Sequence, residues 1–271
     1  MTLRVMTWNL WWRFGPWQER QAAIAAVVAE QDPDVVLLQE VWGADGTSAA
    51  HVLAEAVGGH VAITDDTSPR GGVGFHNAII SRRWPLGDVD SQPLPTEDGR
   101  PSHRRVLSAV VASPWGPWPF VTTHLDYRFD QSSTRQRQAA RLMEIIGARR
   151  GTPDRDLPAV IGGDFNAIPD SDEIRMLTGR SPTPVTGLVL SDCWELAGDG
   201  PGATWRSDNP YQESTAWPNR RLDYVFVSWP RPKPVGNPVA IHLAGHAPVD
   251  GIWPSDHAAV VADLVTPPDP T

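Results

Sequence analysis

Short apolar runs of strand length recur along the chain and alternate with a few longer amphipathic stretches. Val35 to Leu38 is apolar at four consecutive positions, which is typical of a strand buried on both faces. By the same reasoning the pattern predicts strands at 3–8, 35–38, 77–81, 105–112, 120–124, 157–161, 222–227, 239–243 and 258–265.

Helical spacing of apolar residues occurs in fewer places. Residues 18–31 carry Ile24, Val27 and Val28 on one face, and the segment Asp32-Pro-Asp34 stops the pattern. The remaining predicted helices cover residues 48–57, 133–149 and 172–177.

The connecting segments are rich in turn residues. We expect a loop or hairpin at 114–119, mostly loop from 178 to 220, and a frayed tail, 267–271, that begins around Thr266. No repeat or linker-like break in composition divides the chain, so residues 1–266 are predicted to form a single domain. Strands that interleave with few helices favour an α/β architecture of two packed sheets with helices outside.

Composition limits the partners and the compartment. The net charge of −9 over 271 residues opposes binding to nucleic acid or an anionic membrane, unless the site is locally positive. Cys193 is the only cysteine, which excludes an intramolecular disulfide and a cysteine-based zinc site. The sequence shows no signal-peptide pattern and no apolar run of membrane-spanning length, so we expect a cytoplasmic protein, as a monomer.

The strongest candidate for chemistry is the segment Ile161-Gly-Gly-Asp-Phe-Asn166, at the end of a predicted strand. In an extended chain Asp164 and Asn166 point to the same face, and Phe165 points to the other. A carboxylate beside an amide suits a hard cation or a phosphate, and the two glycines allow a close approach of the backbone. The alternative is an Asx-rich turn after a buried strand.

Other predicted strands also end in polar side chains. Taken singly, Asn9 is explained as a turn residue, Glu40 as a strand-end cap and His124 as a core histidine. Repetition of the pattern argues against these separate explanations. The strand-end residues are Asn9, Glu40, His124 with Asp126, Asp164 with Asn166, Asp223, and Asp256 with His257.

Asp223 is difficult to explain as a structural residue. It lies in a strand that is apolar on both faces, where an unpaired carboxylate is very costly. A histidine is a natural partner. In Asp256-His257 the two side chains face opposite ways if the chain is extended, so they can serve different roles in one site.

Six segments together resemble the endonuclease/exonuclease/phosphatase superfamily, and they occur in the order seen there. They cover the chain from residue 3 to about residue 265 and are specific for the superfamily, though not for any member. The segments are Met6-Thr-Trp-Asn9, Gln39-Glu40, Thr123-His-Leu-Asp126, Gly163-Asp-Phe-Asn166, Arg221-Leu-Asp-Tyr224 and Ser255-Asp-His257.

The resemblance implies a four-layer α/β/β/α sandwich of two packed mixed sheets, with the site at one end of the sheets. It also implies a divalent cation, Mg²⁺ or alternatively Mn²⁺, bound by Glu40 with help from Asn9 and Asp256. The implied reaction is hydrolysis of a phosphodiester or phosphomonoester by in-line attack of an activated water.

The resemblance further assigns roles to the remaining motif residues. His257, held by Asp223, and Asp164 orient or deprotonate the water, with the formal base left open between them. Asn166 and His124 hold the non-bridging phosphate oxygens.

Substrate contacts outside the motifs are predicted less directly. Asp126 is either a second metal ligand, a residue that positions Arg128, or a structural acid. The candidate phosphate contacts through bidentate guanidinium groups are Arg104, Arg105, Arg128 and Arg135. Adjacent strand residues point to opposite faces, so one of Arg104 and Arg105 is expected to reach the site.

The substrate itself stays open between nucleic acid and smaller phosphate esters. A nuclease for DNA or RNA needs basic and aromatic surface, for which the candidate stacking residues are Trp11, Trp12, Trp17, Trp205 and Trp217. A phospholipid or inositol-phosphate head-group hydrolase needs an exposed apolar loop, for which 11–17 and 114–119 are the candidates.

Two other function classes are disfavoured. A binding protein without catalysis is expected to have lost a histidine or a metal-binding acid, and none is missing here. Ser255, Asp256 and His257 cannot form a serine-hydrolase triad, because three consecutive residues do not bring the groups together.

Overall fold

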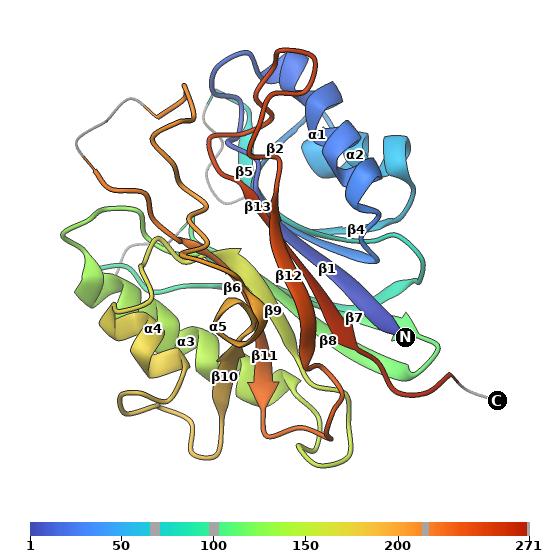
Figure 1. The fold of residues 1–271 in the computed structure, drawn as a ribbon, viewed down its shortest axis with the longest axis vertical. Coiled ribbons are helices and arrows are strands. Elements are labelled where there is room, and N and C mark those ends of the chain that lie inside the picture. Colours follow the sequence, from blue (N-terminus) through green and yellow to red (C-terminus); the bar gives the residue numbers. More distant parts are fainter. Residues whose placement is uncertain (66–70, 98–102, 213–216, 270–271) are drawn as a thin grey trace.

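The strands form two mixed sheets that pack face to face, with helices on the outer faces (Figure 1). The structure is a computed structural model that describes residues 1–65, 71–97, 103–212 and 217–269. In the first sheet the strand order is β12-β13-β1-β2-β5-β4, with β3 paired to β2. In the second sheet the order is β10-β11-β9-β8-β7-β6.

Both sheets draw strands from distant parts of the chain. The first contains β1 (Thr2–Asn9), β2 (Val35–Ala44), β3 (Thr47–Ser48), β4 (His60–Ile63), β5 (Gly74–Ser81), β12 (Pro238–Ala244) and β13 (Ala259–Val265). The second contains β6 (Leu86–Pro93), β7 (Arg105–Ser113), β8 (Gly116–His124), β9 (Val160–Asp164), β10 (Val189–Asp192) and β11 (Asp223–Trp229).

Four helices cover the outer faces. α1 (Trp17–Gln31) and α2 (Ala49–Val57) lie on the first sheet, and α3 (Ser132–Arg149) and α4 (Asp172–Leu177) lie on the second (Figure 1). α5 (Cys193–Ala197) differs, because its Cys193 and Trp194 pack into the apolar cluster between the sheets. In the described part of the chain, every helix is too short or too polar to cross a membrane.

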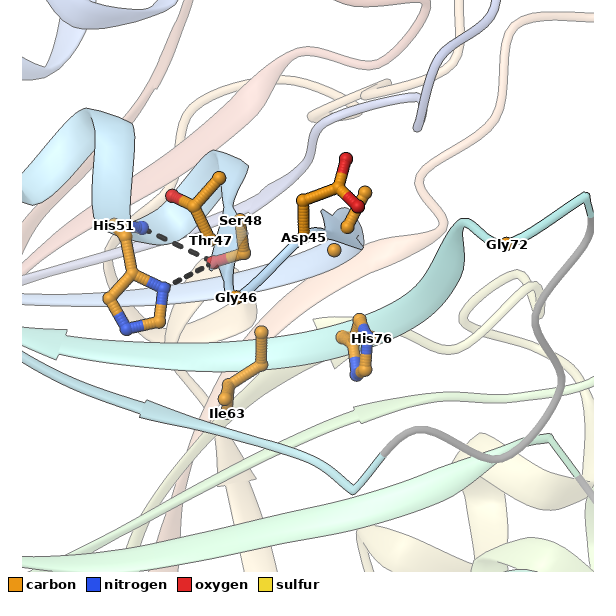
Figure 2. A pocket seen from close by; sticks show the side chains of 10 residues that line it. Asp45, Gly46, Thr47, Ser48, His51, Ile63, Gly72 and His76 are labelled. Carbon is orange, nitrogen blue, oxygen red and sulfur yellow. Dashed lines mark hydrogen bonds between the residues drawn. The ribbon is translucent and has the colours of Figure 1, made fainter.

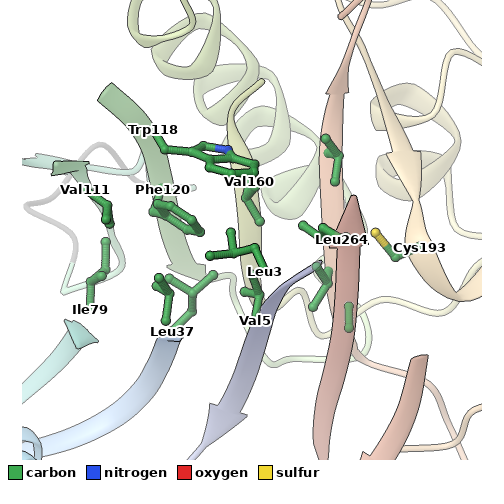
Figure 3. Packing of buried hydrophobic residues seen from close by; sticks show 14 of the residues in the cluster. Leu3, Val5, Leu37, Ile79, Val111, Trp118, Phe120, Val160, Cys193 and Leu264 are labelled. Carbon is green, nitrogen blue, oxygen red and sulfur yellow. The ribbon is translucent and has the colours of Figure 1, made fainter. Parts of the chain in front are cut away.

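Alternation along the central strands explains their continuous apolar runs. Leu3 and Val5 of β1, with Leu37 of β2, face the second sheet and meet Phe120 and Val160 there (Figure 3). The residues between them point the other way, under α1 and α2, and include Met6, Trp8, Val36 and Leu38. Strands covered on both faces need apolar side chains on both faces, as 35–38 indicated.

Each sheet contains one parallel strand pair joined by a crossover helix. β1 pairs with β2 through α1, and β8 pairs with β9 through α3. Parallel strands end at the same edge, so Asn9 lies opposite Gln39 and His124 lies opposite Asp164. The polar strand ends are therefore gathered at one end of the sandwich.

The two glycines before Asp164 allow close packing between protein segments. A Cβ on Gly162 would lie 2.6 Å from Leu37 Cδ1 of the other sheet, and one on Gly163 would lie 2.2 Å from the Thr123 carbonyl oxygen. The close approach anticipated at this segment is thus made by the neighbouring strand and the facing sheet.

The predicted four-layer sandwich is confirmed, and the predicted strands and helices all occur. The hydrophobic pattern missed β3, β4, β6 and, within the segment expected to be loop, β10 and α5; residues 213–216 of that segment lie outside the described residues. The predicted hairpin joins β7 to β8, with its turn at Pro114 and Trp115, and residues 116–119 are strand. Thr266 is buried and donates its hydroxyl to the Met1 carbonyl oxygen, so order extends one residue beyond β13; residues 270–271 of the predicted tail are outside the described part.

Candidate active site

Asn9 connects the two sheets at the end where the site residues gather. Its Nδ2 donates to Glu40 Oε1 at 3.3 Å and to Asp164 Oδ2 at 3.0 Å. Its Oδ1 accepts from the Trp11 N–H at 2.9 Å. The side chain is buried, so the amide fixes one carboxylate from each sheet relative to the other.

Glu40 lies in an irregularity of β2. The pairing of β2 with β5 shifts register between Leu38 and Val41, and Glu40 has a φ of 52°. A non-glycine residue in this left-handed region is uncommon and is tolerated where the surroundings impose it. The bulge directs the carboxylate into the cavity that the other site residues line. Burial and the charge of Asp256 raise the pKa of Glu40 to about 7.

His257 and Asp223 form a buried hydrogen-bonded pair. His257 Nδ1 lies 2.7 Å from Asp223 Oδ2, and His257 Nε2 lies 3.8 Å from Asp164 Oδ2. Burial alone would lower the pKa of His257, but the negative charges of Asp223, Asp164 and Asp256 raise it well above its ordinary value. Asp223 thus has the histidine partner that the sequence predicted, and the other ring nitrogen of His257 faces Asp164.

Thr204 was missed by sequence reasoning and completes this pair. Its hydroxyl donates to Asp223 Oδ2 at 2.5 Å, and Thr204 Oγ1 itself accepts from the N–H groups of Leu222 and Asp223. Thr204 lies in the segment expected to be loop, nineteen positions before its partner, and no local pattern marks it. Its carbonyl oxygen also accepts from the Ala258 N–H, next to His257.

His124 and Asp164 face each other across the parallel β8–β9 pair. His124 Nε2 lies 3.5 Å from Asp164 Oδ2 and 3.9 Å from Glu40 Oε1. Burial and the positive charge of Arg104 lower the pKa of His124 well below its ordinary value, so the ring is neutral. Burial and the charge of Asp223 raise the pKa of Asp164 to about 6.

Asn166 and Asp126 shape the loops beside this pair. Asn166 has a φ of 49°, its N–H donates to Asp164 Oδ1, and its Nδ2 donates to the Leu125 carbonyl oxygen. Asp126 Oδ1 accepts from the Arg128 N–H. Asn166 lines the cavity, whereas Asp126 is not among its lining residues.

Asp256 follows a tightly held serine. The Ser255 hydroxyl donates to the Asn9 carbonyl oxygen at 2.6 Å, which ties the start of β13 to the end of β1. Burial raises the pKa of Asp256, and the charges of His257 and Arg20 partly offset that rise. Asp256 and Glu40 therefore present two carboxylates to the same space from two sides of the first sheet.

The four predicted arginines divide into two groups. Arg104 and Arg128 line the cavity, and the guanidinium of Arg104 lies over the rings of Phe75 and Tyr127. Arg105 instead bonds Ser91 and pairs with Asp65, and Arg135 is buried against Glu173 at 2.6 Å. The last two point away from the cavity, and nothing in their contacts supports a role in binding substrate.

A cavity of about 960 Å³ opens at the site. Of the polar residues described above, Glu40, His124, Asp164, Asn166, Asp256 and His257 line it, and aromatic rings form its walls. The aromatic and apolar lining residues are Trp11, Phe14, Phe75, Tyr127, Phe129, Trp205 and Leu222. Trp11 stacks on Tyr211, with ring centroids 4.5 Å apart, and this contact holds the Trp11 ring in place.

A smaller cavity of about 280 Å³ lies beside the turn between β2 and β3 (Figure 2). Both of its histidines have hydrogen-bond partners: His51 Nδ1 lies 2.8 Å from the Ser48 hydroxyl, and His76 Nδ1 lies 2.8 Å from the Thr64 carbonyl oxygen. None of the predicted site residues lines it.

The residues at the floor of the larger cavity fit a hard divalent cation. Glu40 Oε2 is buried and has no hydrogen-bond partner among the described residues. Burial raises the pKa of Glu40 most; the negative charges of Asp256 and Asp164 raise it further, and the positive charges of Arg104 and His257 partly offset this rise. An all-oxygen set of this kind suits Mg²⁺ or Mn²⁺.

A second group with ligand spacing is Asp164, Asp223 and His257, whose atoms lie within 4.8 Å of one another. Two of its members already share the 2.7 Å hydrogen bond, which a cation between them would break. Glu40 Oε2, by contrast, has no hydrogen bond among the described residues for a cation to replace.

Solved structures of other proteins share the overall fold of this chain. D. rerio TDP2 complexed with single-strand DNA product is 22% identical, with a TM-score of 0.75 over 98% of this chain and 99% of that one. The endonuclease/exonuclease/phosphatase from Beutenbergia cavernae is 25% identical, with a TM-score of 0.73 over 97% of this chain and 71% of that one. The human Nocturnin catalytic domain with bound sulfate is 19% identical, with a TM-score of 0.72 over 97% and 94%.

The sequence comparisons identify the family. Protein angel of Drosophila melanogaster is 24% identical over 218 residues, which is 72% of this chain and 57% of that protein, so the chain spans little more than half of that relative. The family described as Endonuclease/Exonuclease/phosphatase matches residues 6–257, from the start of the first motif to the histidine of the last. The chain therefore belongs to the endonuclease/exonuclease/phosphatase family.

Proposed function

We propose that this chain is a divalent-metal-dependent phosphoesterase that cleaves a phosphodiester by in-line attack of an activated water. One observation carries the proposal: a single cavity floor joins the Glu40–Asp256 oxygen donors, the His257–Asp223 pair and the facing His124 and Asp164. Charge stabilisation by groups already held in place is usually the largest contribution to such a reaction.

Glu40 and Asp256 would hold the cation, Mg²⁺ or Mn²⁺, with Asn9 setting the position of the Glu40 carboxylate. When bound, the ion supplies Lewis-acid polarisation of a phosphoryl oxygen and stabilises the charge that develops there.

The remaining roles follow from protonation state. Asp164, whose pKa is about 6, is ionised at neutral pH yet basic enough to accept a proton from water. His257 is charged and held by Asp223, so its Nε2–H is suited to donate to a non-bridging phosphate oxygen. Neutral His124 and the Asn166 amide contribute further donors, and Arg104 adds positive charge to the cavity wall.

The defining experiment is hydrolysis of bis(p-nitrophenyl) phosphate with and without Mg²⁺ or Mn²⁺. We expect metal-dependent turnover, and a loss of at least about 10²-fold in Glu40→Ala and in His257→Ala. Matched controls are Glu144→Ala and His242→Ala, since Glu144 is exposed on α3 and His242 is exposed on β12, bonded to Gln31. Turnover that needs no metal and survives both site substitutions would refute the proposal.

A second, narrower candidate is a nuclease that acts on single strands. The aromatic walls favour it, because rings beside a phosphate-binding floor allow bases to stack. D. rerio TDP2, one of the similar structures, is complexed with single-strand DNA product. The net charge of −9 opposes it, since most of the surface repels a polyanion.

A substrate panel separates these candidates. It contains single-stranded DNA, plasmid DNA, short RNA, sphingomyelin and inositol phosphates, with Glu40→Ala as the blank. Cleavage of single strands with intact plasmid supports the nuclease, and Phe129→Ala should then weaken binding. If only head groups or small esters are turned over, the aromatic walls bind a leaving group other than a nucleotide base.

A further inference from the structure

Arg20 is a fully buried arginine that the reaction scheme above does not use. It is the fourth residue of α1 and lies on the apolar stripe that Ala23, Ile24, Val27 and Val28 continue. Positive charge in the first turn opposes the helix dipole, and complete burial removes the hydration of the guanidinium. Such a costly placement requires compensation from the surrounding structure.

The compensation comes from five main-chain carbonyl oxygens. Nη1 donates to Leu10 at 2.7 Å and to Pro254 at 2.9 Å. Nη2 donates to Trp11, Trp12 and Phe14 at 3.0, 2.9 and 3.1 Å. Four of these acceptors lie in the loop after Asn9, and the fifth lies in the turn two residues before Asp256.

The loop that Arg20 holds has an unusual conformation. Trp11 and Trp12 are consecutive non-glycine residues with φ of 57° and 37°. Non-glycine residues in this left-handed region are strained and persist only where the surrounding structure holds them. This conformation turns the carbonyl oxygens of Trp11 and Trp12 toward Arg20, and the guanidinium stabilises it by donating to both.

The same loop is bonded to the site residues themselves. The Trp11 N–H donates to Asn9 Oδ1 at 2.9 Å, and the Trp12 N–H donates to the Glu40 carbonyl oxygen at 3.0 Å. Arg20 thus connects, through one rigid loop, the residue that bridges the sheets and the bulged glutamate. Through Pro254 it also reaches the turn that presents Asp256.

We propose, on the basis of the phosphoesterase function proposed above, that Arg20 is a positioning residue for the cation site. Its guanidinium cross-links the 10–14 loop to Pro254 and so fixes Asn9, Glu40 and Asp256 relative to one another. Residues that orient metal ligands from behind typically change metal affinity or activity by about 10–100-fold when removed.

The test compares Arg20→Ala with Arg231→Ala. Arg231 is a suitable control because it is equally buried and also bonds a carbonyl oxygen and neighbouring side chains, but it follows the opposite end of β11 from Asp223. Three quantities are measured for each: kcat with bis(p-nitrophenyl) phosphate per folded molecule, Mn²⁺ affinity by calorimetry, and recovery of both on adding free guanidinium below denaturing concentrations.

We expect Arg20→Ala to lose about 10–100-fold in kcat and in Mn²⁺ affinity, with KM changing less. Free guanidinium should restore part of both, since the five carbonyl oxygens remain to receive it. Arg231→Ala should lose stability while keeping both quantities. If Arg20→Ala does not fold, Arg20→Lys serves instead; it keeps the charge but not the five-acceptor geometry, and an intermediate loss is expected.

Wild-type kcat and Mn²⁺ affinity in a folded Arg20 variant would overturn the inference, as would equal losses in Arg231→Ala. A wild-type chain that binds Mn²⁺ but hydrolyses no ester would refute the proposed function alone, and the affinity measurement would still decide the role of Arg20. A chain that does neither overturns both.

Discussion

In the β1-α1-β2 unit a helix follows a strand that ends at Asn9, and in the β8-α3-β9 unit a helix follows a strand that ends at His124. The fourth residue of each helix is a buried arginine, Arg20 in α1 and Arg135 in α3. Each arginine donates to carbonyl oxygens of the loop before its helix; Arg135 Nη1 reaches Arg128 at 2.6 Å and Asp126 at 3.3 Å.

The two arginines differ in how their charge is balanced. Arg135 pairs with Glu173, a fully buried carboxylate on α4, which the Ser132 hydroxyl also contacts. Arg20 makes no ion pair with any carboxylate in the described part of the chain. Its positive charge instead interacts favourably, at longer range, with Asp256 and Glu40. A buried arginine at the fourth position of a helix therefore has two roles. Arg135, neutralised by Glu173, holds a loop; Arg20, which has no such partner, holds a loop and also stabilises the carboxylates of the site.

The two β-α-β units also bring different side chains to the site. The first provides Glu40 for the proposed cation, with the Asn9 amide holding the Glu40 carboxylate in position. The second delivers His124 and Asp164, which face each other at 3.5 Å and are suited to the phosphate and the attacking water. The two sheets thus bring separate parts of one reaction to a shared end of the sandwich.

The largest expected effects separate these two contributions. Asp164→Asn should lower kcat by at least about 10²-fold at saturating Mn²⁺, because a proton acceptor is lost, while binding of the ion changes less. Glu40→Gln should weaken Mn²⁺ binding first, so that higher metal concentration restores part of its turnover. Metal titrations of kcat measure both, with Glu144→Gln as the surface control.

The comparison of the two units would fail if the two variants behaved alike. Full recovery of Asp164→Asn by added metal would assign Asp164 to the cation, as the cluster with Asp223 and His257 allows. Two-metal occupancy would then have to be considered.

A second test concerns the neutralised arginine. Arg135→Ala leaves Glu173 buried without its cationic partner, so we expect a loss of about 3–5 kcal/mol in the free energy of unfolding. The double variant Arg135→Met with Glu173→Leu should recover most of it, since neither charge is then left alone. Urea denaturation measures the stability, and kcat per folded molecule should change far less than in Arg20→Ala.

Little destabilisation in Arg135→Ala together with a raised KM would contradict this interpretation. It would restore Arg135 to the phosphate contacts for which the sequence made it a candidate.

The fold was predictable because the central strands carry their own signal. Runs such as 35–38 are apolar at every position since both faces of the strand are covered, and α1 and α3 show helical spacing. The pattern missed β6, a largely exposed edge strand whose composition reflects solvent on its surface. It also missed β10 and α5, because short elements fixed by tertiary packing offer too few residues for periodicity to register.

The site was predictable only where a residue ends or directly follows an apolar run in the sequence, although Glu40 proves to lie within β2, at its bulge. Asn9, Glu40, His124, Asp164 and His257 line or bridge one floor because strand ends share an edge of the sheet. Thr204 and Arg20 act across loops, and their partners are set by contacts that no spacing encodes. Arg105 and Arg135 looked suitable by residue type alone, but each has a carboxylate nearby that the sequence could not place.

The smallest expected effect uses pH to test the carboxylate cluster. The folded pKa of Glu40 is raised to about 7 and that of Asp164 to about 6, above the values of an unfolded chain. Their contribution to stability is therefore fully present below the unfolded pKa values and is lost as pH rises through the folded ones, between about pH 4 and 7. A bound cation needs the ionised carboxylates, so it should offset that loss above this window and compete with protons within it.

Mn²⁺ should raise the Tm by several degrees at about pH 8 and much less at about pH 5. Thermal unfolding followed by circular dichroism measures both, and Glu40→Gln should remove most of the increment while Glu144→Gln keeps it. An increment that is equal at the two pH values would mean that the ion binds away from Glu40, and that the first β-α-β unit does not provide the cation site.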